Sequence, residues 1–383
     1  MNPSTRDELF IIVDGIPHKG WQQAQITRSI EAGPHQFSLT LSDRWVTGKN
    51  TQENEQLRTI QVGMPVEVLI NDELIVSGYV DELAPSYDET SHSIRLTGSS
   101  KLSDLVACSS AGKQFKGQSL LSICKTLCKP FAITVQATDN AAIEANKVFT
   151  GRTHTLDLGQ TLWDFLEELA RIRGVLLTSD ADGNLVILKA GTDSADIALE
   201  LGKNIQRANG SFSAENLFSE YHVSGQQPST PKDKGYIGAK VSQPKAQAKA
   251  VVKSKGINRY RPFYISSDNP LSAAQCQARA DWQKNVHEGR AERVTYTLSG
   301  WRQTIDGRLW TPNELVAVVD PWVGLDKERL IVETVFTLGE DGSHTELTVL
   351  PKSAFAKEPE LPTVTKKAQS KRKGYLSPTG EML

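Results

Sequence analysis

The chain has 383 residues, of which 38% are apolar and 23% charged, and its formal net charge is −2. This length predicts roughly two to four domains of about 100 to 150 residues each. The near-neutral charge argues against attraction of the whole surface to nucleic acid, and the sequence lacks the run of about 20 apolar residues that an integral membrane helix needs.

The amino terminus and the cysteines both indicate a reducing compartment. Residues 1–7 lack the basic-then-apolar pattern of a secretory signal, so we expect the chain to be made and folded in a cytoplasm. Cys108, Cys124, Cys128 and Cys276 are interpreted as reduced core residues. Cys124 and Cys128 lie one helical turn apart and could contact a metal, but small side chains on a buried helix face are the preferred interpretation.

Residues 1–100 have the pattern of a β domain. Residues 10–13 precede an Asp14-Gly15 turn signal, and residues 37–41 and 66–70 alternate between apolar and polar side chains. Short strands separated by turns predict a β-barrel or a sandwich that closes near residue 98.

Residues 101–200 predict an α+β domain. A first helix begins after Ser119 as N-cap, and residues 131–135 alternate like a strand. A second amphipathic helix ends at Gly174, and the Asp-Gly-Asn sequence at 182–184 indicates a β-hairpin turn.

The rest of the chain divides into three parts. Residues 201–290 form a connecting region with a helix at 270–288 and a lysine-rich insertion at 226–255, whose seven lysines and one acid predict a mobile loop. Residues 291–352 form a second β-barrel-like unit. Residues 353–383 are expected to be a basic, flexible tail.

A short pattern occurs in both β units. In the first unit, Leu-Ile-Val at 74–76 precedes Ser-His at 91–92 and Leu-Thr at 96–97. In the second unit, Leu-Ile-Val, Ser-His and Leu-Thr recur in the same order, at 330–332, 343–344 and 347–348. The segment before Ser-His is four residues shorter in the second copy. Coincidence remains an alternative, but a true repeat predicts equivalent strands in two similar barrels, with the length difference in the loop between them.

The candidate catalytic and metal-binding motifs fail on spacing. Residues 178–183 resemble a calcium loop, but Lys189 stands where a bidentate carboxylate is required. Asp164 and Glu167 could in principle form the carboxylate pair of a glycosidase. The four-residue spacing of Glu167 and Arg171 instead favours an exposed ion pair on a helix. The histidines are dispersed, and no phosphate-loop, dinucleotide or nucleophile-elbow motif occurs. We therefore predict no catalytic, metal or cofactor residues, and the balance moves towards a binding or structural role.

Basic and aromatic residues are the remaining candidates for contacts with partners. The tail carries a cluster without acids, made of Lys366, Lys367, Lys371, Arg372 and Lys373. It could contact a nucleic-acid backbone or become ordered against a protein partner. Trp301, Trp310 and Trp322 are interpreted as core or rim residues rather than partner anchors.

Several blocks together resemble the tail hub proteins of Mu-like contractile-tailed phages. The blocks are GYVD (78–81), PSYD (85–88), IRLTGSSK (94–101), DLVACS (104–109), WDFLEELAR (163–171), GWRQ (300–303) and LWTPN (309–313). The resemblance runs from about residue 9 to residue 355. Ser99 stands where the family has arginine.

The resemblance implies a multidomain, β-rich α+β protein with two similar β-barrel domains, an α+β domain and a helical or loop insertion. It implies a ring-shaped homotrimer in the virion tail baseplate that joins a threefold spike to the sixfold tail tube, without catalytic residues or cofactors. The lysine-rich insertion and the tail are hypothesised to contact neighbouring tail proteins or the ejected DNA. The alternatives are a tail-associated cell-wall hydrolase and a carbohydrate-binding attachment module.

Overall fold

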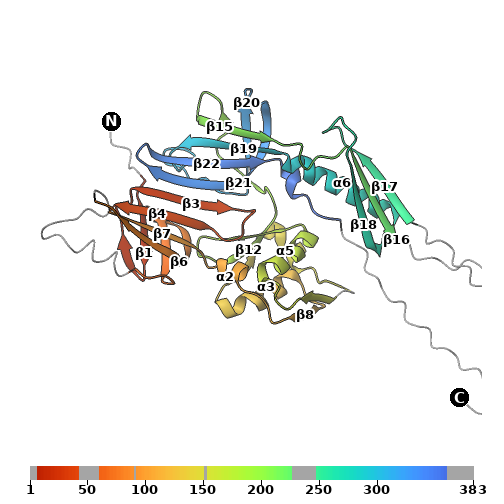
Figure 1. The fold of residues 1–383 in the computed structure, drawn as a ribbon, viewed down its shortest axis with the longest axis horizontal. Coiled ribbons are helices and arrows are strands. Elements are labelled where there is room, and N and C mark those ends of the chain that lie inside the picture. Colours follow the sequence, from red (N-terminus) through yellow and green to blue (C-terminus); the bar gives the residue numbers. More distant parts are fainter. Residues whose placement is uncertain (1–6, 43–59, 90–91, 151–152, 227–246, 360–383) are drawn as a thin grey trace, which may run out of the picture.

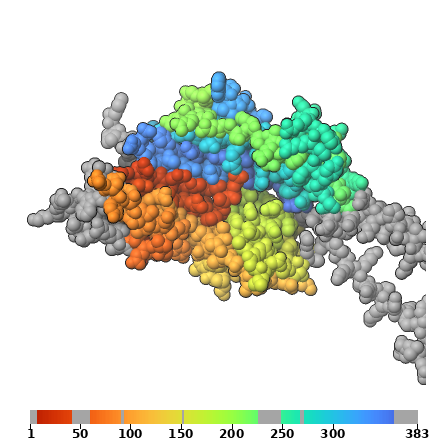
Figure 2. Space-filling model, in the orientation of Figure 1, coloured from red at the N-terminus to blue at the C-terminus, as the bar shows by residue number. Residues whose placement is uncertain are grey.

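The computed structural model describes residues 7–42, 60–89, 92–150, 153–226 and 247–359. Figure 1 shows an elongated body in which a large β-sheet is flanked by an α+β domain and by a small unit of three strands and one helix. Figure 2 shows the amino-terminal strands, in red, packed directly against the carboxy-terminal strands, in blue. Among the described residues, none of the helices combines the length and apolar character required for a membrane span.

The main sheet has 14 strands, and residues from both β units contribute to it. Its amino-terminal strands are β1 (Leu9–Val13), β2 (Ile16–His18), β3 (Gln23–Ser29), β4 (Gln36–Ser42), β5 (Pro65–Ile70), β6 (Glu73–Tyr87) and β7 (His92–Ser100). Its carboxy-terminal strands are β13 (Asp193–Ser194), β14 (Leu199–Glu200), β15 (Ile205–Phe212), β19 (Glu292–Ser299), β20 (Glu314–Asp320), β21 (Leu325–Gly339) and β22 (Gly342–Leu350). The order along the sheet is β15-β19-β22-β21-β3-β4-β7-β6-β5-β1-β2, and β20 pairs with β21, β13 and β14.

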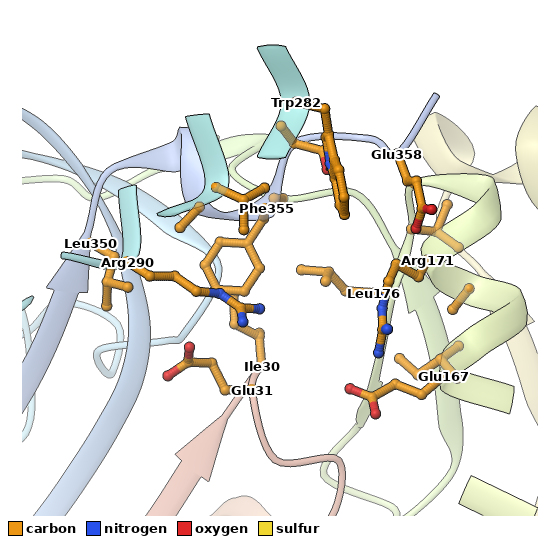
Figure 3. A pocket seen from close by; sticks show the side chains of 18 of the residues that line it. Ile30, Glu31, Glu167, Arg171, Leu176, Trp282, Arg290, Leu350, Phe355 and Glu358 are labelled. Carbon is orange, nitrogen blue, oxygen red and sulfur yellow. The ribbon is translucent and has the colours of Figure 1, made fainter. Parts of the chain in front are cut away.

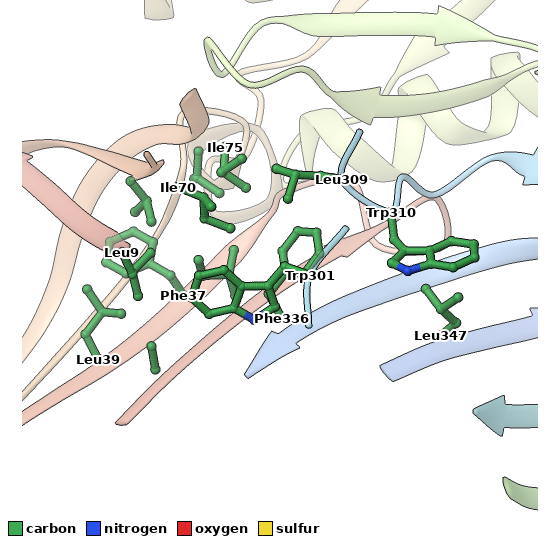
Figure 4. Packing of buried hydrophobic residues seen from close by; sticks show 14 of the residues in the cluster. Leu9, Phe37, Leu39, Ile70, Ile75, Trp301, Leu309, Trp310, Phe336 and Leu347 are labelled. Carbon is green, nitrogen blue, oxygen red and sulfur yellow. The ribbon is translucent and has the colours of Figure 1, made fainter. Parts of the chain in front are cut away.

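One hydrophobic core serves both β units. Phe37 and Leu39 of β4 lie in the same buried cluster as Trp301, Trp310 and Phe336 (Figure 4). The alternation seen in the sequence explains why each strand contributes, because side chains of a strand point to opposite faces in turn. Residues from 1–100 and from 291–352 contribute to one continuous sheet, since β3 pairs with β21 and their apolar faces merge.

The α+β domain has its own core. Its elements are α2 (Ser103–Ala107), β8 (Lys113–Lys116), α3 (Leu120–Cys128), η1 (Lys129–Phe131), β9 (Val135–Ala137), α4 (Asp139–Asn146), β10 (Thr153–Leu156), α5 (Leu162–Arg173), β11 (Leu176–Ser179) and β12 (Leu185–Leu188). Ser119 caps α3 by accepting a hydrogen bond from the Ser122 amide, Gly174 ends α5 with φ of 63°, and β11 pairs antiparallel with β12. These three predictions are confirmed.

The strand expected at 131–135 is wrong. The chain there makes the 3₁₀ turn η1 and a left-handed residue, Ala132, with φ of 54°. Strand β9 begins only at Val135 and pairs parallel to β12. Apolar alternation over five residues could not distinguish this turn from a strand, because short apolar runs are compatible with both.

The small unit consists of β16 (Glu220–Gln226), β17 (Gln247–Lys253), β18 (Pro262–Pro270) and α6 (Ala273–Arg290), and η2 (Lys352–Phe355) packs against α6. Residues 247–253, expected in a loop, form a strand, whereas residues 227–246 of the lysine-rich insertion lie outside the described residues. Helix α6 begins after Ser272, which makes a capping box with Gln275, because β18 continues through Pro270. Gly289 lies inside α6 instead of ending it, and the Ala354 backbone packs against it.

Candidate assembly surface

The seam between β3 and β21 is the structural centre of the molecule. Six antiparallel residue pairs join the strands, from Glu333 opposite Ser29 to Leu338 opposite Ala24. The Ile30 amide extends the ladder by donating to the Val332 carbonyl at 2.9 Å. One strand comes from each β unit, so this seam converts two sequence units into one sheet.

The two units have equivalent hairpins. Strands β6 and β21 each have 15 residues, and β7 and β22 each have nine. Each long strand contains a register shift next to a threonine of its partner strand. In β6 the shift lies between Val80 and Glu82, and Glu82 pairs with Thr97. In β21 it lies between Ile331 and Glu333, and Glu333 pairs with Thr348. The extra residues at these β-bulges, Asp81 and Val332, are therefore equivalent, and they fix the correspondence of the two hairpins.

This correspondence corrects the repeat read from the sequence. Leu96 and Thr97 do match Leu347 and Thr348. Counting from the bulges, however, residues 74–76 match 325–327 instead of 330–332, and His92 matches Ser343 instead of His344. The two hairpins have equal lengths, so the four-residue difference expected in the loop between the strands does not occur. Strands of alternating apolar residues look alike at several offsets, and only the pairing determines the register.

The equivalence extends to the next two strands of each unit. In the first unit, Ala24 of β3 pairs with Leu39 of β4, which pairs with Leu96 of β7. In the second unit, Ala208 of β15 pairs with Tyr296 of β19, which pairs with Leu347 of β22. The strands therefore follow the order β3-β4-β7-β6-β5 in the first unit and β15-β19-β22-β21-β20 in the second. The chain contains one five-strand unit twice, side by side.

Polar contacts lock the two units together beside the seam. The Arg302 guanidinium, before β20, contacts the Asp7 carboxylate at 2.9 Å and the Glu73 carboxylate of β6 at 2.7 Å. These contacts raise the pKa of Arg302 although burial opposes them. The indole of Trp301 donates to the Thr337 carbonyl at 3.0 Å. The GWRQ block therefore connects β6 of the first unit with β21 of the second.

A buried histidine lies where the main sheet meets the α+β domain. His35 is 1% exposed, and its amide donates to the Ser100 hydroxyl at 3.0 Å. Burial and then the charge of Arg28 lower the pKa of His35 to about 3. The Ser179 amide donates to the Gly33 carbonyl, and the Thr178 hydroxyl donates to the Ser29 carbonyl. The imidazole is thus neutral and belongs to a structural junction.

A cleft of about 620 Å³ lies between α5, α6 and η2 (Figure 3). Arg290 points into it from α6, and Glu167 and Arg171 line it from α5. Arg279 forms an ion pair with Glu358, so the segment after η2 is held along the cleft. Arg293, which also lines the cleft, forms an ion pair with Glu31.

The basic tail cluster lies in residues 360–383, outside the described residues. The turn once compared with a calcium loop is a hairpin, in which an Asp180 carboxylate oxygen accepts from the Asn184 amide at 2.7 Å. Over the described ranges, no group of three or more His, Cys, Asp or Glu side chains is placed to hold a metal. Cys124 and Cys128 are fully buried, and burial raises the pKa of Cys128 to about 12.

The tryptophans divide into two classes. Trp301 and Trp310 are each 1% exposed and belong to the core, as the sequence predicted. Trp322 is 89% exposed in the turn between β20 and β21. Sequence reasoning did not predict which strands lie at the ends of the main sheet, β15 and β2, because backbone groups at a strand edge have no residue-type signal.

Comparison with known families identifies three segments of the chain. Residues 8–100 match the model of the Mu phage baseplate assembly protein GpP-like amino-terminal domain. Residues 103–189 match the second domain of the baseplate hub protein gp44-like family, and residues 272–358 match the fourth domain of the Mu phage baseplate assembly protein GpP.

Whole-chain relatives agree with these models. The baseplate hub protein gp44 of Escherichia phage Mu is 30% identical over 353 residues, which cover 89% of this chain and 87% of gp44. The crystal structure of the 43 kDa tail protein of prophage MuSo2 from Shewanella oneidensis is 32% identical with a TM-score of 0.75, covering 91% of this chain and 99% of that one. A tail protein from Neisseria meningitidis shares the fold, with 22% identity, a TM-score of 0.72 and coverage of 92% and 99%.

This fold, two five-strand units side by side with an α+β domain, is thus one that the chain shares with phage tail proteins. Within that class, the chain belongs to the family of the Mu baseplate hub protein gp44. The resemblance noted in the sequence is confirmed. The fold is also shared with a type VI secretion component of E. coli, at 9% identity and a TM-score of 0.54.

Proposed function

We propose that three copies of this baseplate hub protein form a ring that adapts a threefold spike to a sixfold tail tube. The observation that carries the proposal is the β3–β21 seam, which places two equivalent five-strand units beside each other in one chain. Three such chains present six units of one design. Two units that differ in sequence allow threefold contacts on one side and near-sixfold contacts on the other.

The role that follows is structural. The family models and gp44 are described as baseplate proteins, and the Arg279 and Arg302 side chains form ion pairs within the chain. The partners are then further copies of the chain, the tail spike protein and tail tube or baseplate proteins, with assembly in the host bacterial cytoplasm. An obligate ring of this kind needs interfaces above about 2,000 Å².

Native mass measurement combined with electron-microscope class averages tests this function. A three-chain ring with apparent sixfold character is expected. A species that stays monomeric up to the highest soluble concentration contradicts the ring. Peptidoglycan turnover by the purified chain would instead support the hydrolase alternative, and specific glycan retention by a monomer would support the attachment module.

The two lysine-rich segments, residues 232–255 and the tail cluster from Lys366 to Lys373, are proposed contacts for neighbouring tail proteins or for DNA in transit. The support is their composition, since clustered lysines favour polyanions and acidic surfaces. Deletion of residues 366–373 is expected to reduce tail assembly or infectivity while leaving the ring intact. Unchanged assembly and infectivity would contradict the proposal for the tail.

A further inference from the structure

The turn between β20 and β21, residues 321–324, presents the most exposed large apolar side chain in the described part of the chain. Trp322 is 89% exposed there, although tryptophan is on average well buried in proteins. Two more exposed apolar residues lie nearby, Val319 of β20 and Leu201, and the Leu201 amide donates to the Val319 carbonyl at 3.0 Å. Figure 1 shows β20 on the side of the molecule away from the α+β domain.

The Asp320 side chain fixes the backbone of this turn. One of its carboxylate oxygens accepts hydrogen bonds from the Trp322 amide at 3.1 Å and from the Val323 amide at 3.2 Å. Asp320 is itself buried, and Gly324 ends the turn with φ of 79°, which glycine adopts without strain. The indole therefore stands on a preformed turn, so a partner that covers it loses little backbone entropy on binding.

The equivalent turn of the first unit, between β5 and β6, is polar and is covered by the start of the chain. Its central residues are Asn71 and Asp72. The Asn71 side chain accepts from the Glu8 amide at 2.8 Å and donates to the Asp7 carboxylate at 2.7 Å. The two units therefore share their strands but differ at this turn, which makes hydrogen bonds within the chain in one unit and exposes a tryptophan in the other.

We propose that Trp322 is a binding anchor that inserts into an apolar pocket of the threefold partner of the ring, which in the proposed function is the tail spike protein. This inference rests on the proposed ring for its symmetry. In a ring of three chains, three tryptophan turns alternate with three Asn71-Asp72 turns. The ring then carries an apolar anchor at every second unit, although all six units have the same strands.

Symmetry distinguishes the threefold partner from the sixfold tail tube. A sixfold partner offers six identical sites, so a pocket that fits Trp322 would meet the Asn71-Asp72 turn in every second unit. Burial of the Asp72 carboxylate in an apolar pocket is unfavourable, because a buried charge needs a partner there. A threefold partner offers three pockets, one for each tryptophan turn, and leaves the polar turns outside them.

The side chains of the turn define the pocket that fits it. An indole needs an apolar lining and an acceptor oxygen for its N–H when it is buried. Val319 and Leu201 extend the apolar contact beyond the ring of Trp322. Tryptophan is enriched among the few residues that dominate the binding energy of protein interfaces. We therefore expect most of the affinity for the spike protein at this end of the molecule to depend on one side chain.

Binding of the purified tail spike protein and of the purified tail tube protein to the full-length chain tests the anchor. We expect Trp322→Ala to weaken binding of the spike protein by about 30-fold or more, as truncation of a dominant interface tryptophan does, and to leave binding of the tube protein unchanged. Trp322→Phe keeps an aromatic ring and should restore most of the affinity. Ile305→Ala is the matched control, because Ile305 is 84% exposed in the same unit.

The outcomes separate this inference from the proposed function. A trimer whose Trp322→Ala variant binds the spike protein as well as the Ile305→Ala variant does overturns the anchor and leaves the ring standing. Loss of tube binding alone overturns the choice of the threefold partner. A Trp322→Ala chain that no longer forms trimers assigns Trp322 to a contact between copies and also overturns the anchor. An unmodified chain that is monomeric at every concentration overturns the ring, and with it the symmetry argument.

Hydroxyl-radical footprinting on the unmodified protein gives a second measurement that does not depend on a variant. Trp322 is expected to be oxidised readily in the free trimer and to become protected when the spike protein is added, whereas Ile305 stays reactive in both. Protection of Trp322 in the free trimer, or equal oxidation with and without the spike protein, contradicts the anchor.

Discussion

Ile26 of β3 and Phe336 of β21 lie directly opposite each other in the main sheet, and each is 1% exposed. One residue belongs to each β unit, so their contact belongs to the junction between the units. The hydrophobic cluster around them contains residues from Leu9 to Val349. Stability and architecture therefore depend on the same seam.

Replacement of Ile26 by alanine should destabilise the whole sheet. Removing a buried isoleucine side chain loses transfer free energy and leaves a cavity, so we expect the free energy of unfolding to fall by about 2 to 4 kcal/mol. The matched control is Ile305→Ala, since Ile305 is 84% exposed. Urea denaturation followed by circular dichroism measures both, and similar losses in the two variants would contradict the role of the seam.

The fragments of the chain should differ in their ability to fold. Residues 101–190 contain a complete hydrophobic cluster and are expected to fold alone. Residues 7–100 are expected to fail, because separation from β21 exposes Ile26 and removes Trp301 and Phe336 from the core. Dispersion of amide NMR signals distinguishes the cases. A well-dispersed spectrum from residues 7–100 would show that the first unit is independent.

Replacement of Arg302 by glutamine should loosen the contact between the units. The change keeps a polar side chain but leaves the Asp7 and Glu73 carboxylates without the guanidinium that both contact. We expect a loss of about 1 to 3 kcal/mol in the free energy of unfolding, as for charged hydrogen-bonded groups that lose a partner. Lys19→Gln, which removes a solvent-exposed ion pair with Glu8, should have little effect.

His35 should make the free energy of unfolding depend on pH. Its pKa is about 3 in the folded chain and about 6.5 when unfolded, so below pH 6.5 the unfolded chain binds a proton that the folded chain does not. The free energy of unfolding therefore falls as the pH drops from about 6.5 towards 3, and this contribution is complete above pH 6.5. His35→Gln should reduce the loss between pH 7 and 4.5 by about 2.5 kcal/mol.

The measurement for His35 is a series of urea unfolding curves across that pH interval. The relevant quantity is the slope of stability against pH, because the substitution also changes packing and so shifts stability at every pH. Parallel curves for His35→Gln and the unmodified chain would show that the imidazole takes up no proton on unfolding.

Gly33 should not tolerate a side chain. A Cβ at this position would lie 2.0 Å from the Trp163 ring, which packs the α+β domain against the main sheet. We expect Gly33→Ala to cost about 1 to 3 kcal/mol, as overpacking does. Gly339→Ala is the control, because nothing lies within 4 Å of its Cβ position. In a Trp163→Ala background the Gly33→Ala cost should shrink, and an unchanged cost would contradict this contact.

Local features of the sequence predicted local structure correctly. The Ser119 cap, the Gly174 helix end and the Asp182–Asn184 turn depend on residues close in the chain, whose side-chain or backbone preferences act within one turn. The burial of Trp301 and Trp310 agrees with the general tendency of large aromatic side chains to lie in a core. The family also followed from contiguous blocks of residues, which pairwise comparison confirmed.

The pairing of the strands and its register emerge only in the folded chain. The sequence contained the repeat, but it placed residues 74–76 against 330–332, whereas the bulges at Asp81 and Val332 place them against 325–327. The pairing of β3 with β21 has no local signal, since backbone hydrogen bonds between remote strands are the same for any pair of residues. A side-chain period of two allows many offsets, and the shared core selects one.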